Sequence, residues 1–485
     1  MKKSLRELSK NLIKNINDVP DLKISGVNIH SSKIRPGDLF IAISGSKYDG
    51  HNFIPEAVKN GAKAIITNGR SFEDLTVPQL KVKNPRKAAS IVAANFYQNP
   101  SKDLKMIGIT GTNGKTTVSS ILSKIIECAG YSVAQLGTLG LKSKLINYPK
   151  TLTTPDSISL QKTLSILKKN KYSHVVMEVS SHGIDQHRVD SIDFDFAVFT
   201  NLTPEHLDYH KSMEKYFDAK AQLFRKLKNN AVAIINDGDK YGKRLKSKMK
   251  CSTTSFSFKN KNQIHYKSIT MSLSGINGEI DTGNNNYIIE SKLIGQFNAE
   301  NILSAVAVAH SLGIKKEIIE KGIKLCPTIP GRMEILNQKN GAKVVIDYAH
   351  TPDAYKKILS TIKNLSPMGS QLFLVFGAGG DRDRTKRSKM AQIAEIYSDY
   401  CFITPDNPRN EDPKEISNDI IKGFKGNNYL LFDNREEGLK SALKKCRRND
   451  IVVVLGKGRE EYQEIENEKI FYSDIATIKE TGAII

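Results

Sequence analysis

The chain has 485 residues, of which 39% are hydrophobic and 26% are charged. This length predicts about three domains, since one domain takes roughly 150 residues. No apolar run approaches the roughly 20 residues of a membrane span, and residues 1–16 lack a signal-peptide core, so we expect a cytoplasmic protein without a membrane partner.

The formal net charge of +22 favours anionic substrates. It does not indicate nucleic acid, because the lysines are spread along the chain and only residues 240–250 form a dense basic run, which no aromatic stacking pattern accompanies. The five cysteines lie far apart without a C-x-x-C pair, so neither a disulfide framework nor a zinc site is indicated.

Residues 1–99 predict a small α/β domain. A strand is expected within residues 37–45, and a helix followed by a strand within residues 53–68. A second helix starts near residue 85 and should stop at the Asn99-Pro100 break, because proline and the residue before it disfavour a helix.

From residue 103 onward, apolar strands alternate with amphipathic helices, which is typical of a parallel, doubly wound sheet. The expected strands are residues 105–111, 131–137, 174–181, 194–202 and 231–237, and the expected helices include residues 116–130, 157–170 and 213–227. Residues 251–296 turn to short alternating strands with glycine and asparagine turns, which predicts a small antiparallel appendage. A helix then returns at residues 297–313, and we expect this central domain to span residues 100–330.

A second alternating series begins near residue 342 and predicts a Rossmann-like domain over residues 331–485. Its expected strands are residues 342–350, 371–380, 400–406, 428–434 and 450–458. No G-x-G-x-x-G follows the first of them, so dinucleotide binding is not implied. The expected fold class is therefore α/β with three domains.

Residues 107–120, IGITGTNGKTTVSS, join a buried strand to a helix through a glycine-rich loop. A phosphate cradle needs inward-pointing backbone N–H groups, a helix N-terminus and a lysine for the outer phosphates. The loop offers all three, with Gly111 and Gly114 able to adopt positive φ, although it misses the usual G-x-x-x-x-G-K-[ST] spacing by one residue. We expect Lys115 to reach the β- and γ-phosphates and the Thr116 hydroxyl to bind Mg²⁺. The alternative is a glycine-rich turn with a solvated lysine. Nucleotide binding is favoured, because G-K-T-T at a strand-to-helix junction is more specific than a lone glycine pattern.

Polar residues follow several predicted strands, at the edge where parallel sheets bind ligands. Glu178 follows an apolar strand next to the phosphate loop and is the expected Mg²⁺ partner; the alternative is a helix-capping or surface carboxylate. His206 and His210 are weaker candidates, because a single histidine is more often structural than a ligand. Lys220 lies in the middle of a predicted helix, where a solvated side chain is the default.

Motifs along essentially the whole chain resemble those of the Mur ligases. They include GITGTNGKTT (108–117), MEVSSHGIDQHRV (177–189), TNLTPEHLDYH (200–210), GQFNAENILSAVA (295–307), PGRMEI (330–335), DYAHTPDA (347–354), DNPRNEDP (406–413) and GKGREEYQ (456–463). In that family the loop reads T-G-T-x-G-K-T, which accounts for the shifted glycine. Within the family the chain is similar to the members that add a third amino acid to UDP-N-acetylmuramoyl-L-Ala-D-Glu.

The resemblance implies a UDP-binding N-terminal domain, a central ATPase domain and a C-terminal domain that binds the incoming amino acid, in a monomer. ATP would phosphorylate the D-Glu γ-carboxylate, and the amine would attack the acyl phosphate. Lys115 would stabilise the phosphates, Thr116 and Glu178 would hold one Mg²⁺, and His206 with a carbamylated Lys220 would help to hold a second. A carbamate turns the lysine cation into an anion that suits an oxygen-preferring metal.

The resemblance also implies two sets of binding residues. Those for ATP are Gly111, Thr112, Asn113, Gly114, Lys115, Thr116, Thr117, Asn298, Asn301, Arg332 and Asp347, with His350 in the loop of Asp347. Those for the UDP-muramoyl dipeptide are Ser31, Thr153, Thr154, Ser180, Gln186 and Arg188. The chain departs from the family pattern in three places, with His30-Ser31-Ser32 for Asp-Ser-Arg, Glu205 for Asp and Arg459 for a common His.

The run DNPR at residues 406–409 bears on which amino acid is added. Meso-diaminopimelate differs from lysine by a distal carboxylate, which the planar fork of Arg409 can bind with two hydrogen bonds. The resemblance favours diaminopimelate, with a pocket formed by Asp406, Asn407, Pro408 and Arg409 and completed by Arg382, Gly456 and Glu460, the last of which would bind the distal ammonium. The alternative for the run itself is an ordinary turn with a surface arginine.

Three other functions remain open from the residues. They are the same ligation with L-lysine, a related ligase of the folylpolyglutamate or D-Ala-D-Ala-adding type, and a basic P-loop ATPase stimulated by nucleic acid. The N-terminal domain and DNPR argue against the related ligases. The sequence offers no recognition module for DNA or RNA, so we expect no nucleic-acid partner.

Overall fold

The computed structural model describes residues 2–45, 48–70, 72, 75–148, 152–258, 264–466 and 468–484. The chain divides into two compact units. The first comprises Met1–Leu202, His210–Ile264 and Ser304–Gly322, and the second comprises Thr203–Tyr209, His265–Leu303 and Ile323–Ile485. The boundaries expected from the sequence, 1–99, 100–330 and 331–485, stay a prediction. Among the helices of the described residues, none is long and apolar enough to cross a membrane.

The N-terminal part of the first unit contains a parallel sheet in the order β3-β4-β5-β6. Its strands and helices are β1 (Lys3–Ser4), β2 (Lys23–Ile24), β3 (Val27–Asn28), β4 (Leu39–Ile41), β5 (Ala64–Thr67), β6 (Gln79–Lys81), α1 (Leu5–Leu8), α2 (Ile54–Lys59) and α3 (Pro85–Phe96). Helix α3 begins after Asn84, whose side chain accepts a hydrogen bond from the N–H of Lys87. Its end precedes Asn99, which adopts a left-handed φ of 48° before Pro100, so the predicted break is confirmed.

The central sheet of the first unit has the order β13-β12-β11-β7-β10-β8-β9, and all neighbours are parallel except β8 and β9. Its strands are β7 (Lys105–Thr110), β8 (Val133–Gly137), β9 (Gly140–Ser143), β10 (His174–Glu178), β11 (Phe194–Phe199), β12 (Leu227–Asn236) and β13 (Ser252–Phe256). The helices are α4 (Lys115–Cys128), α5 (Ser157–Lys169), α6 (Ser181–Asp185), α7 (Leu207–His210), α8 (Met213–Ala221) and α9 (Lys240–Lys246). The buried strand β7 therefore lies between β10 and β11, so that three strand ends meet beside the phosphate loop.

The predicted appendage is an antiparallel sheet of β14 (His265–Ser272), β15 (Gly275–Asp281) and β16 (Asn286–Ser291) in the second unit. Helix α10 (Gln296–Ser311) follows it and contributes residues to both units, and α11 (Lys316–Lys324) comes next. The helix predicted for residues 213–227 ends early, because a 3₁₀ turn replaces it over Gln222–Lys226.

The C-terminal sheet has the order β21-β20-β19-β22-β18-β17-β25, with parallel pairing from β21 to β18 and antiparallel pairing of β17. Its strands are β17 (Glu334–Gln338), β18 (Lys343–Asp347), β19 (Leu372–Phe376), β20 (Tyr400–Ile403), β21 (Tyr429–Leu431), β22 (Ile451–Leu455) and β25 (Ala483–Ile484). A separate hairpin consists of β23 (Tyr462–Ile465) and β24 (Glu468–Phe471).

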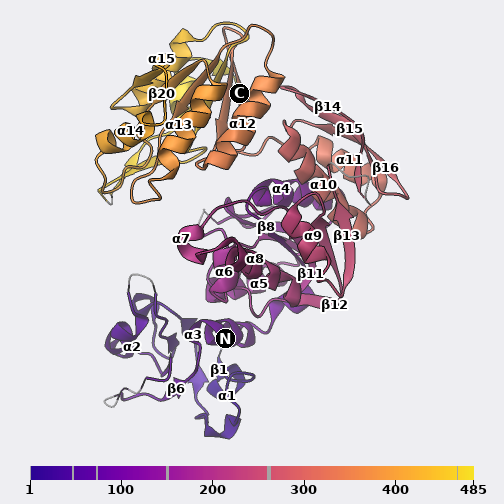
Figure 1. Ribbon diagram of the computed structural model, residues 1–485. Helices are drawn as coiled ribbons and strands as arrows, with labels where there is room; N and C mark the ends of the chain where they lie inside the picture. Colours follow the sequence, from indigo (N-terminus) through magenta and orange to yellow (C-terminus); the bar gives the residue numbers. More distant parts are fainter. Residues whose placement is uncertain are drawn as a thin grey trace. The chain divides into compact units, whose positions relative to one another are not determined.

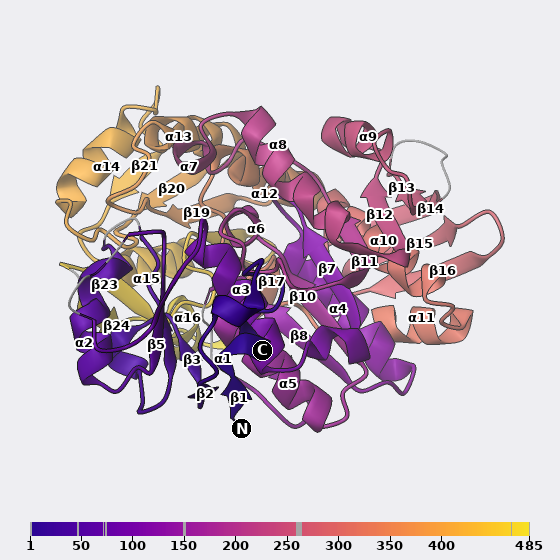
Figure 2. The ribbon, with the colours of Figure 1, turned by 90° about the horizontal axis from the view of Figure 1, so that it is seen from below.

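Helices cover both faces of this C-terminal sheet. They are α12 (Pro352–Leu365), α13 (Lys386–Tyr397), α14 (Pro413–Ile421), α15 (Arg435–Lys445) and α16 (Asp474–Glu480). Leu374 of β19 packs with residues of α12, α13 and α14, whereas its neighbour Val375 packs with residues of α15 and α16. The two layers lie on opposite sides of β19 and β20 (Figures 1 and 2). The expected α/β class, with a parallel central sheet, an antiparallel appendage and a Rossmann-like C-terminal sheet, is confirmed.

Candidate active site

The glycine-rich loop joins the end of β7 to the start of α4, as predicted. Gly111 has a φ of 152° and Gly114, the N-cap residue of α4, a φ of 89°. A Cβ on Gly111 would collide with the Thr200 hydroxyl, so only glycine fits there. The first-turn N–H groups of α4 have no acceptors within the helix and carry its positive dipole end, which suits an anion.

Lys115 folds over this loop. Its ammonium nitrogen donates hydrogen bonds to the carbonyl oxygens of Gly111 and Thr112, both at 2.9 Å. These two contacts hold the loop cation to the backbone. Its contact with phosphate stays a prediction.

Two residues after β11 brace the loop and were not predicted as its partners. The N–H groups of Thr112 and Asn113 donate to the backbone and side-chain oxygens of Asn201, each at 2.9 Å, and the Thr200 hydroxyl donates to the Asn113 carbonyl at 2.6 Å. Two of the N–H groups expected to face phosphate therefore point to Asn201. Binding of phosphate by residues 111–117 stays a prediction.

Glu178 ends β10 beside the loop and is fully buried. Its carboxylate accepts hydrogen bonds from the Thr116 hydroxyl and from the Thr138 hydroxyl and N–H, all at 3.0 Å. A Cβ on Gly137 would collide with this carboxylate. The surface-carboxylate alternative is therefore wrong, and the structure brings Thr116 and Glu178 together. Hydroxyl and carboxylate oxygens suit Mg²⁺, but the metal itself stays a prediction.

Lys220 is buried, with 1% of its surface exposed, so the default of a solvated lysine is wrong. Its ammonium nitrogen donates to the Gly111 carbonyl at 2.8 Å and lies 4.6 Å from the centre of the Tyr216 ring. The Tyr216 hydroxyl in turn lies 3.2 Å from the Thr112 hydroxyl. The middle of α8 is thus connected to the phosphate loop, whereas carbamylation of Lys220 stays a prediction.

The two histidine candidates fall in different surroundings. His210 is buried, and its Nε2 lies 3.0 Å from the Ser181 hydroxyl. His206 belongs to the second unit, has a φ of 55°, and lies with its Nε2 3.9 Å from Glu205, whose carboxylate is equally far from His350. Within the described ranges, no group of three or more His, Cys, Asp or Glu side chains could hold a metal, so His206 stays a predicted ligand.

The residues predicted to bind the dipeptide gather around the end of β10. The Thr154 hydroxyl donates to the Glu178 carbonyl at 3.0 Å and accepts from the Ser180 N–H at 2.9 Å. Arg188 donates to the Thr154 carbonyl and to the Gln186 side chain, each at 2.6 Å. Thr153 lies 3.2 Å from the Thr138 hydroxyl. The structure thus connects these predicted substrate residues with the predicted metal ligand Glu178.

Ser31 lies in the N-terminal part, in a 3₁₀ turn over Ser31–Lys33. It is largely buried, and its hydroxyl donates to the Glu56 carboxylate at 2.7 Å. Its backbone carbonyl accepts from the Asn60 side chain at 3.0 Å. Ser31 therefore fixes the start of α2 to its own turn, and its role toward uridine stays a prediction.

The second unit holds the remaining residues predicted to bind ATP. Asn298 and Asn301 are buried and joined by a 3.1 Å hydrogen bond. Asp347, at the end of β18, accepts from the N–H groups of Met333 and Ala349 at 2.8 Å. Burial raises the pKa of Asp347, although the nearby Arg332 cation and the two N–H donors oppose this shift. The Asp347 loop and the Arg332 turn are thereby fixed to each other.

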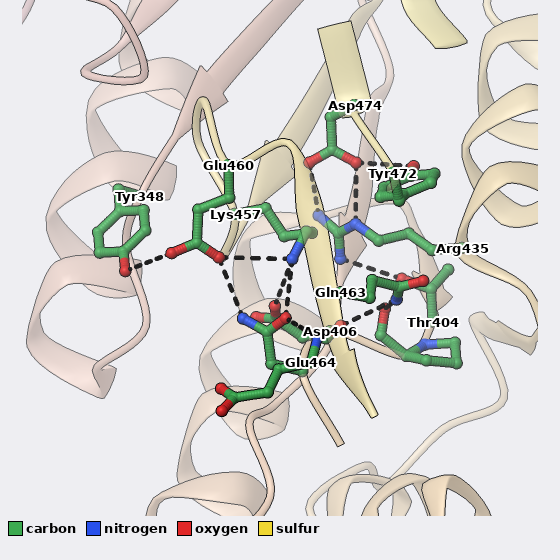
Figure 3. A network of polar contacts seen from close by, with 12 residues as sticks. Tyr348, Thr404, Asp406, Arg435, Lys457, Glu460, Gln463, Glu464, Tyr472 and Asp474 are labelled. Carbon is green, nitrogen blue, oxygen red and sulfur yellow. Dashed lines mark hydrogen bonds and ion pairs between the residues drawn. The ribbon is translucent and has the colours of Figure 1, made fainter. Parts of the chain in front are cut away.

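Residues of DNPR and GKGRE meet in one polar network, and Figure 3 labels Asp406, Lys457 and Glu460 within it. The Glu460 carboxylate accepts from the Tyr348 hydroxyl at 2.9 Å and from the Asn407 amide at 3.0 Å. The fully buried Lys457 lies 3.4 Å from Glu460, 3.0 Å from the Asn407 side-chain oxygen and 3.6 Å from Asp406. One buried cation therefore sits among two carboxylates and an amide that were predicted to bind the amino acid.

Arg409 and Arg382 lie beside the same glycine. A Cβ on Gly379 would come within 3.0 Å of the Arg409 guanidinium and 3.8 Å of Arg382. Arg409 has a φ of 54°, and its Nε donates to the Glu464 carboxylate at 3.0 Å while one terminal nitrogen donates to the Gly380 carbonyl at 2.7 Å. Its side chain is partly buried and bonded to Glu464 and Gly380, which argues against the alternative of a solvated surface arginine. A carboxylate of the chain itself engages one edge of the predicted fork.

Gly456, Gly380 and Arg459 also make close contacts in this region. A Cβ on Gly456 would come within 2.5 Å of the Asp406 carboxylate, and Pro408 packs its carbonyl against Gly380. Arg459 makes two hydrogen bonds to Glu334, whose carboxylate also accepts from the Gly331 N–H at 2.9 Å. Through Glu334, Arg459 thus holds the turn that contains Arg332.

Sequence reasoning missed a buried ion pair behind this network. Arg435, at the start of α15, donates to both oxygens of Asp474 at 2.9 Å and also to the Thr404 hydroxyl at 3.2 Å and the Leu455 carbonyl at 3.0 Å. Thr404 follows β20 and Leu455 ends β22, so one guanidinium spans the strand ends that lead into both loops. No sequence pattern distinguishes this arginine from a surface helix residue.

Three family models match successive parts of the chain. They are "Mur ligase family, catalytic domain" over residues 23–97, "Mur ligase middle domain" over residues 109–309 and "Mur ligase, glutamate ligase domain" over residues 331–458.

Curated relatives match nearly the full length. The UDP-N-acetylmuramoyl-L-alanyl-D-glutamate–2,6-diaminopimelate ligase of Syntrophomonas wolfei is 38% identical over 97% of each chain, and that of Fusobacterium nucleatum is 40% identical over 94% of this chain and 93% of its own. A solved structure of a ligase with the same name has a TM-score of 0.71 and 30% identity over 99% of both chains. A MurF structure from Acinetobacter baumannii, 19% identical with a TM-score of 0.69 over 99% of both chains, shows a similar fold.

Proposed function

The chain belongs to the Mur ligase family, and on that premise we propose that it adds meso-diaminopimelate to the D-Glu γ-carboxylate of UDP-N-acetylmuramoyl-L-Ala-D-Glu in peptidoglycan synthesis. It is an ATP-dependent, amide-forming ligase. The names of relatives that match 97% of the chain support the choice of substrate. A location in the cytoplasm and a monomeric state are part of the same proposal.

The proposed reaction has two steps. An oxygen of the γ-carboxylate attacks the γ-phosphorus of ATP and ADP leaves; the amine nitrogen then attacks the acyl carbon, and phosphate leaves as the nitrogen loses a proton. Phosphoryl transfer of this kind depends on positioning and on charge neutralisation. Lys115 and the start of α4 would bind the phosphates, and Mg²⁺ held by Thr116 and Glu178 would neutralise part of their charge.

The observation that most favours diaminopimelate is the place of Arg409 beside the network that holds Glu460. Arg409 lies two residues after Asn407, whose amide donates to Glu460, and its guanidinium lies close to Gly379, as does the Cγ atom of Arg382. The Arg409 cation suits the distal carboxylate of diaminopimelate and the Glu460 anion suits its ammonium group, whereas lysine has no distal carboxylate for the arginine. Glu464 bonds to the Nε atom of Arg409, and we propose that the opposite edge of the guanidinium contacts the distal carboxylate of diaminopimelate.

The test measures ATP-dependent phosphate release with UDP-N-acetylmuramoyl-L-Ala-D-Glu and either meso-diaminopimelate or L-lysine. We expect release with diaminopimelate and little with lysine. Equal release with both would retain the ligase and overturn the specificity; release with neither would overturn the substrate assignment, and the departure at His30-Ser31-Ser32 would then be examined with other UDP-linked acceptors.

The role of Arg409 is tested separately. Arg409→Ala should raise the KM for diaminopimelate by a factor equivalent to about 2–5 kcal/mol, the usual cost of truncating one partner of a buried charge pair. The KM for ATP should stay unchanged. An equal rise in both constants would contradict the assignment of Arg409 to the amino acid.

The metal proposal has its own measurement. Removal of divalent ions with EDTA should abolish phosphate release, and added Mg²⁺ should restore it. Mass spectrometry of the intact protein at high bicarbonate should detect a carbamate on Lys220, a gain that Lys220→Met should prevent. Full activity in EDTA would contradict the metal role of Thr116 and Glu178.

A further inference from the structure

Tyr348 lies between two groups of residues with different predicted ligands. It follows Asp347 at the end of β18, on the side predicted to bind ATP, and its hydroxyl reaches Glu460, which is predicted to bind the amino acid (Figure 3). The sequence analysis did not single it out.

The backbone of Tyr348 is fixed to the turn that contains Arg332. Its N–H donates to the Gly331 carbonyl at 3.0 Å, and the preceding Asp347 accepts from the Met333 N–H at 2.8 Å. The Arg332 guanidinium carbon lies 5.4 Å from the centre of the Tyr348 ring, within the range of a cation–π contact. A shift of this ring would therefore change its contact with the Arg332 guanidinium.

The same ring packs against the GKGRE loop. A Cβ on Gly458 would come within 3.2 Å of both Cβ and Cδ2 of Tyr348, and Gly458 has a φ of 55°. Both the close approach and the left-handed backbone favour glycine at residue 458. This loop therefore closes directly on the tyrosine ring.

The hydroxyl end of Tyr348 holds one oxygen of Glu460, while Asn407 and Lys457 hold the other. Burial and the Glu460 charge raise the pKa of Tyr348 above its ordinary value, so the hydroxyl stays protonated and donates. A carboxylate fixed from both sides has a defined orientation toward a ligand ammonium group.

We propose that Tyr348 is a positioning residue that orients Glu460 for the incoming amino acid with its hydroxyl and Arg332 for the nucleotide with its ring. This inference rests on the proposed function, because it takes the ligands of Glu460 and Arg332 from there. Tyr348 makes the orientation of the two side chains interdependent within one unit.

Two substitutions separate the two ends of the side chain. Tyr348→Phe removes the hydroxyl and keeps the ring, so the KM for diaminopimelate should rise about tenfold, since hydrogen bonds to charged groups are among the stronger ones, while the KM for ATP stays unchanged. Tyr348→Leu removes both, so the KM for ATP should also rise, by about fivefold.

Tyr355→Phe is the matched control. Tyr355 is fully buried in α12, and among the described residues its hydroxyl has no hydrogen-bond partner. Its removal should change neither KM. Thermal unfolding of all three variants separates a positioning role from a structural one, because Tyr348→Phe should raise the KM at an unchanged midpoint.

The unsubstituted enzyme is assayed beside the variants. If it forms no product with diaminopimelate, the proposed function is overturned and this inference with it. If it forms product but Tyr348→Phe retains its KM for diaminopimelate, or raises both KM values equally, only the inference is overturned.

Discussion

The phosphate loop and the network around Glu460 stabilise charge in opposite ways. In the loop, the cations of Lys115 and Lys220 bond to backbone carbonyls, and the single carboxylate of Glu178 is held by threonine donors. In the C-terminal network, side chains of opposite charge hold one another, with Lys457 beside Glu460. In these contacts the charged groups of the loop are held by neutral groups, whereas the network pairs opposite charges.

This difference teaches where each region is vulnerable. Removal of the Lys115 cation takes away a charge at the start of α4, where we propose that phosphate binds, so ligand binding should suffer more than folding. Removal of a network cation leaves a buried carboxylate uncompensated, so folding should suffer first.

The largest expected effect concerns the buried cation of Arg435, next to the C-terminal network. Arg435→Met leaves Asp474, which is 1% exposed, without its cation, and should lower the free energy of unfolding of the second unit by about 3–5 kcal/mol. Urea denaturation measures the change. Lys444→Met, at an exposed position of the same helix, is the control, and equal stability of the two variants would break the comparison.

Next in size is the loss of the loop cation. Lys115→Met should lower ATP-dependent phosphate release by about 100- to 1,000-fold, since a preorganised charge on the transferred group is lost. The midpoint of thermal unfolding should stay the same. Lys124→Met in the same helix controls for the loss of a lysine. If Lys115→Met lowered the midpoint as much as Arg435→Met does, the loop and the network would not differ in their effect on stability.

A smaller effect is expected from the donors around Glu178. Thr138→Val removes a hydroxyl donor and should raise the Mg²⁺ concentration for half-maximal activity about tenfold, the lower end of the usual effect of a metal's outer-shell partners. Thr110→Val is the isosteric control, because within the described chain its buried hydroxyl has no hydrogen-bond partner. An unchanged Mg²⁺ requirement would show that Thr138 does not orient Glu178.

The smallest effect concerns the partly exposed pair of Arg409 and Glu464. Glu464→Gln should raise the KM for diaminopimelate by about threefold, because a partly solvated ion pair contributes little and Gly380 still holds Arg409. Glu466→Gln in the same hairpin is the control. A fall in KM would mean that Glu464 competes with the substrate for the arginine.

The two regions also differ in how far the sequence predicts them. The loop is one contiguous segment, so strand, glycines, lysine and helix could be predicted together, and Glu178 followed from its place after an apolar strand. Thr138 follows β8 in the same way, and the rule that led to Glu178 could have found it. Thr200 and Asn201 brace the loop from another strand end, and only the sheet order brings them there.

The C-terminal network joins segments far apart in the chain. Lys457 and Arg435 look like surface residues in a lysine-rich sequence, and their burial depends on how β20, β22 and α15 pack. The strand β17 was missed because Glu334–Gln338 is short, contains only two apolar residues, Ile335 and Leu336, and does not alternate polar with apolar residues. Local patterns therefore predicted the parallel strands well, and long-range packing decided the rest.

The packing of Gly458 against Tyr348 sets a limit on mutational tolerance. A scan of all substitutions through this turn should find glycine favoured at position 458, because a Cβ there would crowd Cβ and Cδ2 of Tyr348 and the left-handed backbone strains other residues. Position 461, exposed three residues later, would accept most amino acids. The difference in tolerance between neighbouring positions would therefore identify the residues that contact Tyr348.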